Sequence, residues 1–372
     1  MKTVMDKYLG ERFQRQLQLT GFDSSSQECL RESRVLVIGA GGLGCPVLMY
    51  LAAAGVGRLD VADGDVVEIS NLHRQVLFGV NDAGRNKAIV AIGILSARFP
   101  ELAGKAIPEM VTQTNALALL EGYDLIIDGS DNFQTRYIVN DACALLNKPL
   151  LYGAVNGFEG QVALFNPGMG ADRLCYRDLF PSPPPPGVIP DCMTNGILGT
   201  VPGLAGVLMA GEAIKFLAGM AVQIGRLRIF NALSMEFHEL EITPSDDKKQ
   251  PDNTIAFLAY DYHTFCGGIT EVQEASFEDL NSWWHDNPAE VCVIDVRERQ
   301  EISGKLMPGI INLPASEWDL SLDGIDKRNR VVLLCQTGVR SRRVGGQLKK
   351  RYPDLKVYSL KGGVHGLRIT IG

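Results

Sequence analysis

Short apolar runs alternate with amphipathic stretches through the first part of the chain. The apolar runs predict buried strands at 35–38, 59–62, 125–128 and 150–152, and the stretches between them predict helices at 46–54, 86–98 and 137–146. Strands and helices in this order are typical of a doubly wound α/β sheet. Three later runs predict further, antiparallel strands at 160–165, 226–230 and 236–241. The expected fold is therefore a Rossmann-like doubly wound mixed sheet.

The most apolar stretch, 203–220, contains Glu212 and Lys215 and follows Pro202. Two charges within such a short run favour a buried helix over a transmembrane span, so we expect no association with a membrane.

A polar stretch rich in helix-breaking residues, 243–253, follows the predicted sheet. We expect a first domain over 1–243, a linker over 244–265 and a second, smaller α/β domain over 266–372. The clearest elements of the second domain are strands at 290–295 and 330–334 and a basic helix at 340–352. The charges of that helix are more typical of a solvated face than of a binding patch.

Composition supports two globular domains and excludes some functions. The chain has 372 residues, of which 46% are hydrophobic and 21% charged, and its net charge is −7. An acidic chain is atypical of nucleic-acid binders, which carry a basic surface. The eight cysteines are scattered, and no signal peptide is recognisable at the N-terminus. Reduced thiols and a cytoplasmic location are therefore expected.

A glycine loop follows the first predicted strand, with Gly39, Gly41, Gly42 and Gly44, and Asp63 ends the second strand. Taken alone, these residues match the dinucleotide fingerprint of a dehydrogenase. Two cations, Arg74 and Lys87, follow closely. Backbone N–H groups and a helix N-terminus largely suffice for the two phosphates of a dinucleotide, so extra cations favour a more highly charged ligand such as a triphosphate.

Asp131 follows the strand at 125–128, where open α/β sheets bind ligands. A carboxylate there can hold Mg²⁺ beside a triphosphate or steer an incoming carboxylate by its charge. The alternative is that Asp131 only caps the following helix. For Arg74 and Lys87, the alternative is that they are ordinary surface charges.

Taken together, these motifs resemble the MoeB/ThiF/HesA family of ubiquitin-activating-like adenylyltransferases. The similarity rests on Arg12 to Gln16, the glycine loop, Asp63 and Asp65, the run Ser70, Asn71, Leu72, His73, Arg74 and Gln75, then Lys87, and Ser130, Asp131 and Asn132. Only the set is specific, because a glycine loop alone is a weak signal.

The resemblance implies an enzyme that uses ATP and Mg²⁺ to adenylate the C-terminal Gly-Gly of a ubiquitin-like sulfur carrier. It assigns contacts with ATP to Gly42, Asp63, the run from Ser70 to Arg74, Lys87, Asp131 and Asn132. Asp63 would bind the ribose, and Asp131 would be the essential acid beside Mg²⁺. The cations would neutralise charge that grows during transfer. Arg15 would reach the site from a neighbouring subunit, which implies a homodimer.

A second candidate site is the loop Cys335, Gln336, Thr337, Gly338, Val339 and Arg340, between a predicted strand and the basic helix. Backbone N–H groups and a helix N-terminus lower the pKa of a thiol. A phosphatase-like loop needs arginine six residues after the cysteine, where this chain has Ser341, so the shorter loop favours sulfur chemistry. The alternative is a buried structural cysteine, which this position makes less favourable.

The region resembles a rhodanese domain. The similarity rests on 294–298, on 307–314 and on Leu360 to Gly363, although His365 stands where rhodaneses usually have tryptophan. It implies that Cys335 carries a persulfide, loaded by an upstream donor such as a cysteine desulfurase, and passes sulfur to the activated carrier.

The crossing segment between the predicted strands contains Cys192. It is either an incidental loop thiol or, by the resemblance, a cysteine that links covalently to the carrier. Related proteins hold zinc with two Cys-x-x-Cys pairs. Here the first pair has only Cys175 and the second is absent, so we expect no structural zinc.

Two other functions stay open at this point: a nicotinamide-dependent oxidoreductase with a rhodanese appendage, and a non-enzymatic scaffold that binds a carrier. Arg74, Lys87 and Asp131 have no evident place in the first. The carrier and its pathway, whether molybdopterin, tRNA thiolation, thiamin or a secondary metabolite, stay undefined.

Overall fold

The computed structural model describes residues 10–166, 173–184, 196–245, 250–266, 272–302, 309–318, 320, 330–352 and 354–364. The chain divides into two compact units, Met1–Tyr262 and His263–Gly372. Each unit is built around its own sheet, as the sequence predicts.

The first unit contains an eight-stranded mixed sheet in the order β3-β2-β1-β4-β5-β6-β7-β8. Its strands are β1 (Arg34–Ile38), β2 (Arg58–Ala62), β3 (Ala106–Ile107), β4 (Leu125–Asp128), β5 (Leu150–Asn156), β6 (Glu159–Phe165), β7 (Arg226–Asn231) and β8 (Glu236–Glu241). The first five pair in parallel and the last three are antiparallel. The predicted doubly wound mixed sheet is confirmed.

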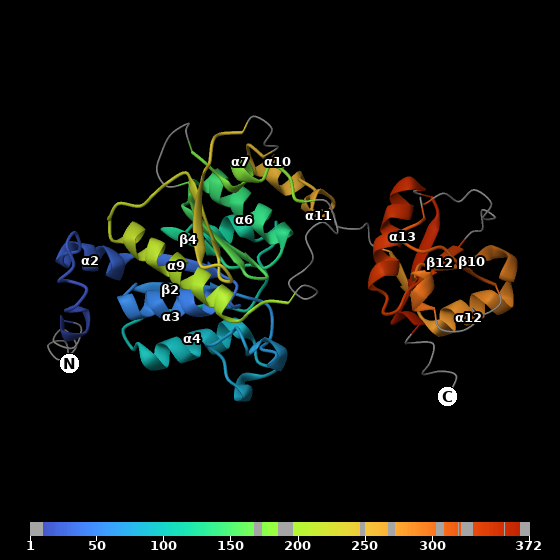
Figure 1. Ribbon diagram of the computed structural model, residues 1–372, viewed down its shortest axis with the longest axis horizontal. Helices are drawn as coiled ribbons and strands as arrows, with labels where there is room; N and C mark the ends of the chain where they lie inside the picture. The colour runs from blue at the N-terminus through green and yellow to red at the C-terminus, as the bar shows by residue number, and fades with distance from the viewer. Residues whose placement is uncertain are drawn as a thin grey trace. The chain divides into compact units, whose positions relative to one another are not determined.

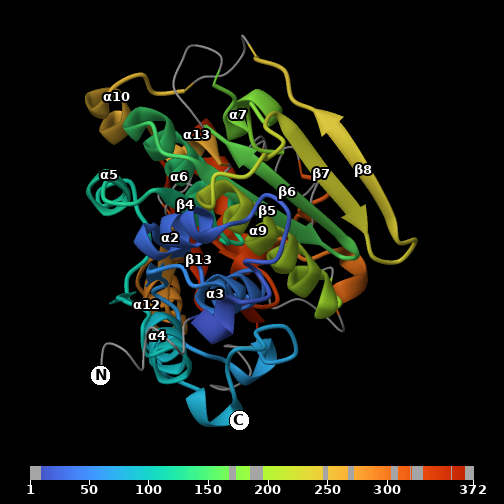
Figure 2. The same ribbon diagram turned by 90° about the vertical axis from the view of Figure 1, so that its left-hand side faces the viewer.

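Helices cover both faces of this sheet (Figure 1). They are α2 (Ser24–Glu32), α3 (Gly44–Ala54), α4 (Lys87–Arg98), α5 (Ala116–Leu120), α6 (Phe133–Leu146), α7 (Tyr176–Leu179) and α9 (Thr200–Leu217), with 3₁₀ turns at Ile69–Asn71 and Val80–Asp82. Helices α3, α4 and α9 lie on one face, and α5 and α6 on the other (Figure 2). The chain changes face between β1 and β4, the switch point where such sheets bind ligands.

Within the described residues, one helix, α9, is long and apolar enough to span a membrane by length and composition, and half of it is buried. It packs on α3, β5 and β6, and its Glu212 forms ion pairs with Lys215 and Arg228. These contacts agree with the predicted buried helix.

The second unit contains a parallel five-stranded sheet in the order β11-β10-β12-β13-β9. Its strands are β9 (Gln273–Ala275), β10 (Val291–Asp295), β11 (Ile310–Asn312), β12 (Arg330–Leu334) and β13 (Lys356–Leu360), and its helices are α12 (Phe277–Asp286) and α13 (Val339–Arg351), with 3₁₀ turns at Pro288–Glu290 and Arg299–Glu301. A smaller α/β domain is therefore present, as predicted.

The expected linker, 244–265, contains regular structure. Two short helices, α10 (Thr254–Ala259) and α11 (Tyr262–Phe265), lie within it. Asn253 caps α10 by accepting a hydrogen bond from the Ala256 N–H, and Phe257 and Tyr262 are buried. Aromatic burial against the first unit explains why the division falls after Tyr262, past the polar stretch that suggested the boundary.

Candidate active site

The glycine loop connects β1 to α3 at the switch point. Gly39 has a φ of +86°, and a side chain at Gly44 would place its Cβ 2.0 Å from the Gly39 carbonyl oxygen. Glycine is required at both positions because no other residue fits this turn. The loop lines a pocket with Gly39, Gly41 and Gly42, and it brings the N-terminus of α3 close to the pocket. That arrangement suits an anion.

Asp63 follows β2 and faces this loop. Its carboxylate accepts hydrogen bonds from the Ala40 and Asp65 backbone N–H groups, both at 2.8 Å. Burial raises the pKa of Asp63, and the two hydrogen bonds offset part of that increase because they favour the charged form. Each oxygen keeps a lone pair, so Asp63 can still accept a ligand hydroxyl.

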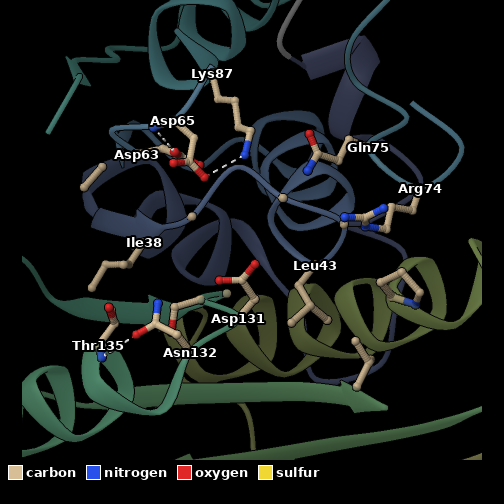
Figure 3. Close-up of a pocket in the computed structure, with 18 of the residues that line it drawn as sticks. Ile38, Leu43, Asp63, Asp65, Arg74, Gln75, Lys87, Asp131, Asn132 and Thr135 are labelled. Carbon is tan, nitrogen blue, oxygen red and sulfur yellow. Dashed lines mark hydrogen bonds and ion pairs between the residues drawn. The ribbon is translucent and has the colours of Figure 1, made fainter. Parts of the chain in front are cut away.

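Lys87 begins α4 and points into the pocket from one side, while Asp131 points in from the other (Figure 3). The Lys87 side chain is 8% exposed, and its Nζ lies 3.0 Å from a carboxylate oxygen of Asp65, which is 53% exposed. Asn86 caps α4 and donates to the Asp63 and Asp65 carbonyls, which fixes the start of the helix beside the pocket. The Lys87 ammonium group is therefore held at the pocket wall by the Asp65 carboxylate. Because that carboxylate is well solvated, a phosphate of the ligand can take its place beside Lys87.

Arg74 and Gln75 form the next part of the wall, after the 3₁₀ turn Ile69–Asn71. Arg74 donates to the Asn71 side-chain oxygen, and Ser70 Oγ donates to Glu68 at 3.3 Å. Gln75 is buried, and its Oε1 has no hydrogen-bond partner within the described part of the chain. A buried, unpaired amide oxygen that lines a pocket is available to a ligand.

The loop after β4 carries Asp131. Asp128, buried below it, accepts a hydrogen bond from the Ser130 N–H at 2.9 Å, and Arg136 donates to the Ser130 carbonyl at 3.1 Å. Burial raises the pKa of Asp128, although Arg136 partly counteracts this. Asp131 itself is exposed and forms no hydrogen bond or ion pair with the described residues. The loop is thus held from below while its carboxylate stays free.

Asn132 also lines the pocket, and its side-chain oxygen caps α6 by accepting from the Thr135 N–H at 2.9 Å. The capping role that the sequence offered as the alternative for Asp131 therefore belongs to Asn132.

Most of the predicted nucleotide residues meet in this one pocket. They are Gly39, Gly41, Gly42, Asp63, Asp65, Arg74, Gln75, Lys87, Asp131 and Asn132. Gly44, Ser70 and Asn71 do not line it. Arg15 is exposed, and within the described residues it forms only a long hydrogen bond, to Gln18 at 3.4 Å. Cys192 lies outside the described residues.

Sequence reasoning missed the rest of the lining. It consists of Ile38, Leu43, Ala62, Met110, Val111, Gly129, Ser130, Thr135, Val155, Ile197 and Pro202. Most are apolar, and Met110, Val111, Val155, Ile197 and Pro202 come from segments that no local motif marks. Ser130 stood in the quoted motif, and its buried hydroxyl has no partner among the described residues.

Cys335 lies between β12 and α13 in the second unit, as predicted. Its sulfur accepts hydrogen bonds from the Gly338 N–H at 3.2 Å and from the Ser341 N–H at 3.4 Å, and the Ser341 hydroxyl lies 3.5 Å away. Burial alone would raise the pKa of Cys335, but the donors from Ser341 and the loop backbone outweigh it and the pKa is lowered. By contrast, burial raises the pKa of Cys45 to about 12, so that thiol is inert.

Glycines also shape this second loop. Gly338 has a φ of +94°, and a Cβ at Gly363 would lie 2.2 Å from the Cys335 carbonyl oxygen. The Val364 N–H donates to that same carbonyl at 2.8 Å. The final rhodanese signature therefore supports the sulfur loop directly. The side chain of Val339 and all of His365 lie outside what the structure describes.

Two arginines line the pocket beside Cys335, together with Gln336 and Thr337. Arg340 donates to both carboxylate oxygens of Glu301, so the carboxylate neutralises much of the positive charge of Arg340 beside the loop. Arg343 is exposed and reaches the pocket from the next turn of α13. The sequence predicts a solvated face for this helix, and the exposure of Arg343 agrees with that prediction although the side chain also lines the pocket.

Cys175 donates to Gln250 Oε1 at 3.3 Å, and Asp178 accepts from the Cys175 and Ser245 N–H groups at 2.8 and 2.9 Å. Among the described residues no group of three or more potential ligands could hold a metal ion. The expectation of no structural zinc stays a prediction, because residues 246–249 are not described.

Comparison with known proteins assigns the two parts of the chain to known families. A ThiF family model matches residues 13–252, and a rhodanese-like domain model matches residues 276–369. The chain belongs to the ThiF family. The ThiF match includes every predicted nucleotide residue, and the rhodanese-like match includes the whole Cys335 loop.

Relatives of this ThiF-family chain are enzymes. The Thermus thermophilus sulfur carrier protein adenylyltransferase is 46% identical over 266 residues, covering 69% of this chain and 96% of that protein. The Mycobacterium tuberculosis protein named probable adenylyltransferase/sulfurtransferase MoeZ is 38% identical over 367 residues, covering 95% and 91%. Drosophila grimshawi adenylyltransferase and sulfurtransferase MOCS3 is 35% identical over 375 residues, covering 95% and 83%.

Among solved structures, E. coli MccB with ATP matches with a TM-score of 0.53 and 24% identity, over 62% of this chain and 70% of that one. This likeness supports the fold alone. The relatives show that this ThiF-family chain is an adenylyltransferase and sulfurtransferase, and adenylyl transfer implies the use of ATP. The oxidoreductase and scaffold alternatives are therefore set aside.

Proposed function

We propose that this chain adenylates the C-terminal Gly-Gly carboxylate of a ubiquitin-like sulfur carrier and then converts it into a thiocarboxylate. The observation that carries the proposal is one pocket in which Arg74 and Lys87 face Asp131 across a glycine loop. Two cations suit the phosphates of ATP, and the free carboxylate lies on the opposite side.

In the first step, a carboxylate oxygen of the carrier attacks the α-phosphorus of ATP, and the bond to pyrophosphate breaks. Arg74, Lys87 and the N–H groups of the glycine loop stabilise charge that shifts onto pyrophosphate. Asp63 accepts a ribose hydroxyl, and the unpaired oxygens of Gln75 and Ser130 supply further polar contacts.

The residues present also fit Mg²⁺. The carboxylate of Asp131 is an oxygen ligand of the type Mg²⁺ prefers, and it is not engaged by another described residue. When bound, Mg²⁺ neutralises phosphate charge. Asp131 would hold the ion, and the hydrogen bonds of Asp128 and Arg136 to Ser130 keep the Asp131 loop in place.

In the second step, the terminal sulfur of a Cys335 persulfide attacks the acyl carbonyl and AMP leaves, which gives an acyl disulfide. A thiol then attacks the sulfur of Cys335, which releases the thiocarboxylate and leaves Cys335 in a disulfide with that thiol. A second thiol reduces this disulfide and frees Cys335 for another cycle. Cys192 or an external thiol would serve, and a cysteine desulfurase would reload Cys335. The lowered pKa of Cys335 supports this role, because the thiolate is the nucleophile that takes up sulfur.

The proposal includes a homodimer in which Arg15 acts on the neighbouring subunit's site. The exposure of Arg15, away from its own pocket, supports this arrangement. It also includes a cytoplasmic location, since a reducing compartment preserves the thiol of Cys335.

The test is ATP–pyrophosphate exchange with a ubiquitin-like protein that ends in Gly-Gly. We expect exchange that requires the carrier and is lost in Asp131→Ala, while Cys335→Ser retains exchange but makes no thiocarboxylate. Exchange without the carrier, or full exchange by Asp131→Ala, would contradict the proposal.

A further inference from the structure

The pocket beside the Cys335 loop is small and cationic. Its volume is about 280 Å³, and it is lined by Cys335, Gln336, Thr337, Arg340 and Arg343. Pockets for drug-sized ligands begin at about 300 Å³, so this one suits a small molecule. Two of the lining residues are arginines, and none of the described carboxylates lines the pocket. The charge of these arginines therefore decides which small molecules the pocket attracts.

Carboxylates already hold three arginines near this loop. The ion pairs are Arg297 with Asp295, Arg340 with Glu301, and Arg342 with Glu274. In each pair the negative charge lies within hydrogen-bond distance of the guanidinium, so it offsets most of the positive field that the arginine would otherwise produce. These three arginines accordingly add little net charge to the surroundings of Cys335.

Arg343 differs from these three arginines because its charge is not paired. Its side chain is exposed and forms no hydrogen bond or ion pair with another described residue. It stands one turn into α13, which begins at Val339. Side chains on a helix lean toward the helix N-terminus, which explains how the long side chain of Arg343 reaches back to the pocket. Its guanidinium donors are free to bind a ligand beside Cys335.

The chemistry of Cys335 gives this free cation a task. The Gly338 and Ser341 N–H groups donate to the Cys335 sulfur at 3.2 and 3.4 Å, so these donors are already occupied by the thiolate. A sulfur donor that carries negative charge must approach the thiolate against Coulomb repulsion. Of the two arginines that line the pocket, only Arg343 has an unpaired charge that can offset this repulsion.

We propose that Arg343 is a specificity-determining residue for sulfur transfer: it binds the anionic group of a small sulfur donor while Cys335 takes the outer sulfur of that donor. This inference rests on the proposed function, in which Cys335 carries the persulfide. The guanidinium presents several N–H groups in one plane, which suits an anion with two or more oxygens.

The transfer step balances without a further reactant. The Cys335 thiolate attacks the outer sulfur of the donor, and a bond forms between the two sulfur atoms. The bond between that outer sulfur and the anionic group of the donor breaks, and its electron pair leaves with the anionic group. Cys335 is left as a persulfide, and with thiosulfate as the donor the leaving group is sulfite.

The test compares two donors that differ in charge. Methanethiosulfonate has a methyl group where thiosulfate has a charged oxygen, and both deliver one sulfur atom. The rate of persulfide formation on Cys335 is measured in the full chain against the concentration of each donor. We expect Arg343→Met to raise the KM for thiosulfate about tenfold and that for methanethiosulfonate about threefold or less, with kcat within about twofold. Each variant is compared with the wild type on the same donor, so differences in donor reactivity cancel.

Two variants serve as controls. Arg343→Lys keeps the charge and should hold the KM for thiosulfate within about threefold of the wild-type value. Arg342→Met removes an arginine from the same helix that is paired with Glu274 and does not line the pocket, so it should load like the wild type. Added salt should raise the KM for thiosulfate in the wild type and much less in Arg343→Met, because screening acts on the charge that the variant lacks.

Several results would overturn the inference. They are a wild type that thiosulfate does not load, an equal effect of Arg343→Met on both donors, and a loss confined to kcat. A further protein combines Arg340→Met with Glu301→Gln, which removes that ion pair without changing the net charge. It should raise the KM for thiosulfate less than Arg343→Met does, and a larger increase would assign the role to Arg340.

Thiocarboxylate formation separates this inference from the proposed function. It is measured after a cysteine desulfurase has loaded Cys335, and Arg343→Met should then equal the wild type, because no small anion takes part. Normal thiocarboxylate formation with loading that ignores donor charge would contradict only the role of Arg343. Loading by thiosulfate that depends on Arg343, without any thiocarboxylate, would contradict the proposed function and leave the role of Arg343 standing.

Discussion

Replacing Lys87 with methionine tests the electrostatic role of the pocket. Methionine keeps an unbranched apolar side chain in a position that is 8% exposed, and it removes one positive charge. Asp65 loses its partner but is 53% exposed, so water can solvate it and stability should fall by about 1 kcal/mol at most. The substitution therefore removes a positive charge from the pocket with little loss of folding stability, so a loss of activity can be attributed to the charge.

The magnitude follows from Coulomb's law. Two unit charges 4 Å apart interact by about 4 kcal/mol at an effective dielectric constant of about 20, which corresponds to roughly 10³ in rate. Because the Asp65 carboxylate already neutralises part of the Lys87 charge, we expect a loss of about 10²–10³ in the rate of exchange.

The assay is carrier-dependent ATP–pyrophosphate exchange, with thermal unfolding measured in parallel. Lys105→Met is the matched control, because Lys105 is exposed and does not line the pocket. A Lys87→Met protein that unfolds like the wild type and exchanges within about threefold of it, less than ~1 kcal/mol in the barrier, would refute the electrostatic argument.

Three further predictions concern other residues. Asp131→Asn should lower exchange by at least about 10²-fold without changing the thermal midpoint, because Asp131 bonds to no described residue; a lower midpoint would show a structural role. Ser341→Ala should raise the pKa of Cys335 and move the pH profile of its alkylation by iodoacetamide to higher pH, since the serine hydroxyl favours the thiolate; an unchanged profile would count against that contact. Gly44→Ala should lower the free energy of unfolding, measured by urea denaturation, by about 3 kcal/mol or more, because its Cβ would lie 2.0 Å from a carbonyl oxygen. Gly93→Ala, in open space on α4, is the control and should raise that free energy by about 0.5–1 kcal/mol.

Local patterns predicted the parts of the site that depend on backbone conformation. The turn at Gly39 and Gly44 needs glycine for steric reasons. Asp63 directly follows β2, and Asp131 lies in the loop after β4, and both strands end at the same edge of the sheet. Such features produce recognisable patterns in consecutive residues, so the doubly wound sheet and the pocket beside it could be predicted.

Contacts between distant elements produce no such pattern in the sequence. Met110, Val155 and Pro202 line the pocket from three separate segments, and none belongs to a motif. Tyr262 stood in what composition described as a linker, and the partner of its buried hydroxyl is Asp141, more than a hundred residues earlier. Likewise, the pairing of Arg340 with Glu301 depends on how the start of α13 meets the 3₁₀ turn Arg299–Glu301, which no sequence spacing predicts.

The central claim is that one chain activates a carrier carboxylate and places sulfur on it, and intact-mass spectrometry tests this directly. A Gly-Gly-ended carrier is incubated with the protein, ATP, Mg²⁺, a persulfide source and a thiol reductant. We predict a carrier heavier by about 16 mass units, as oxygen is replaced by sulfur, and no such product with Cys335→Ser. A carrier that is adenylated yet gains sulfur equally well without Cys335 would contradict the account.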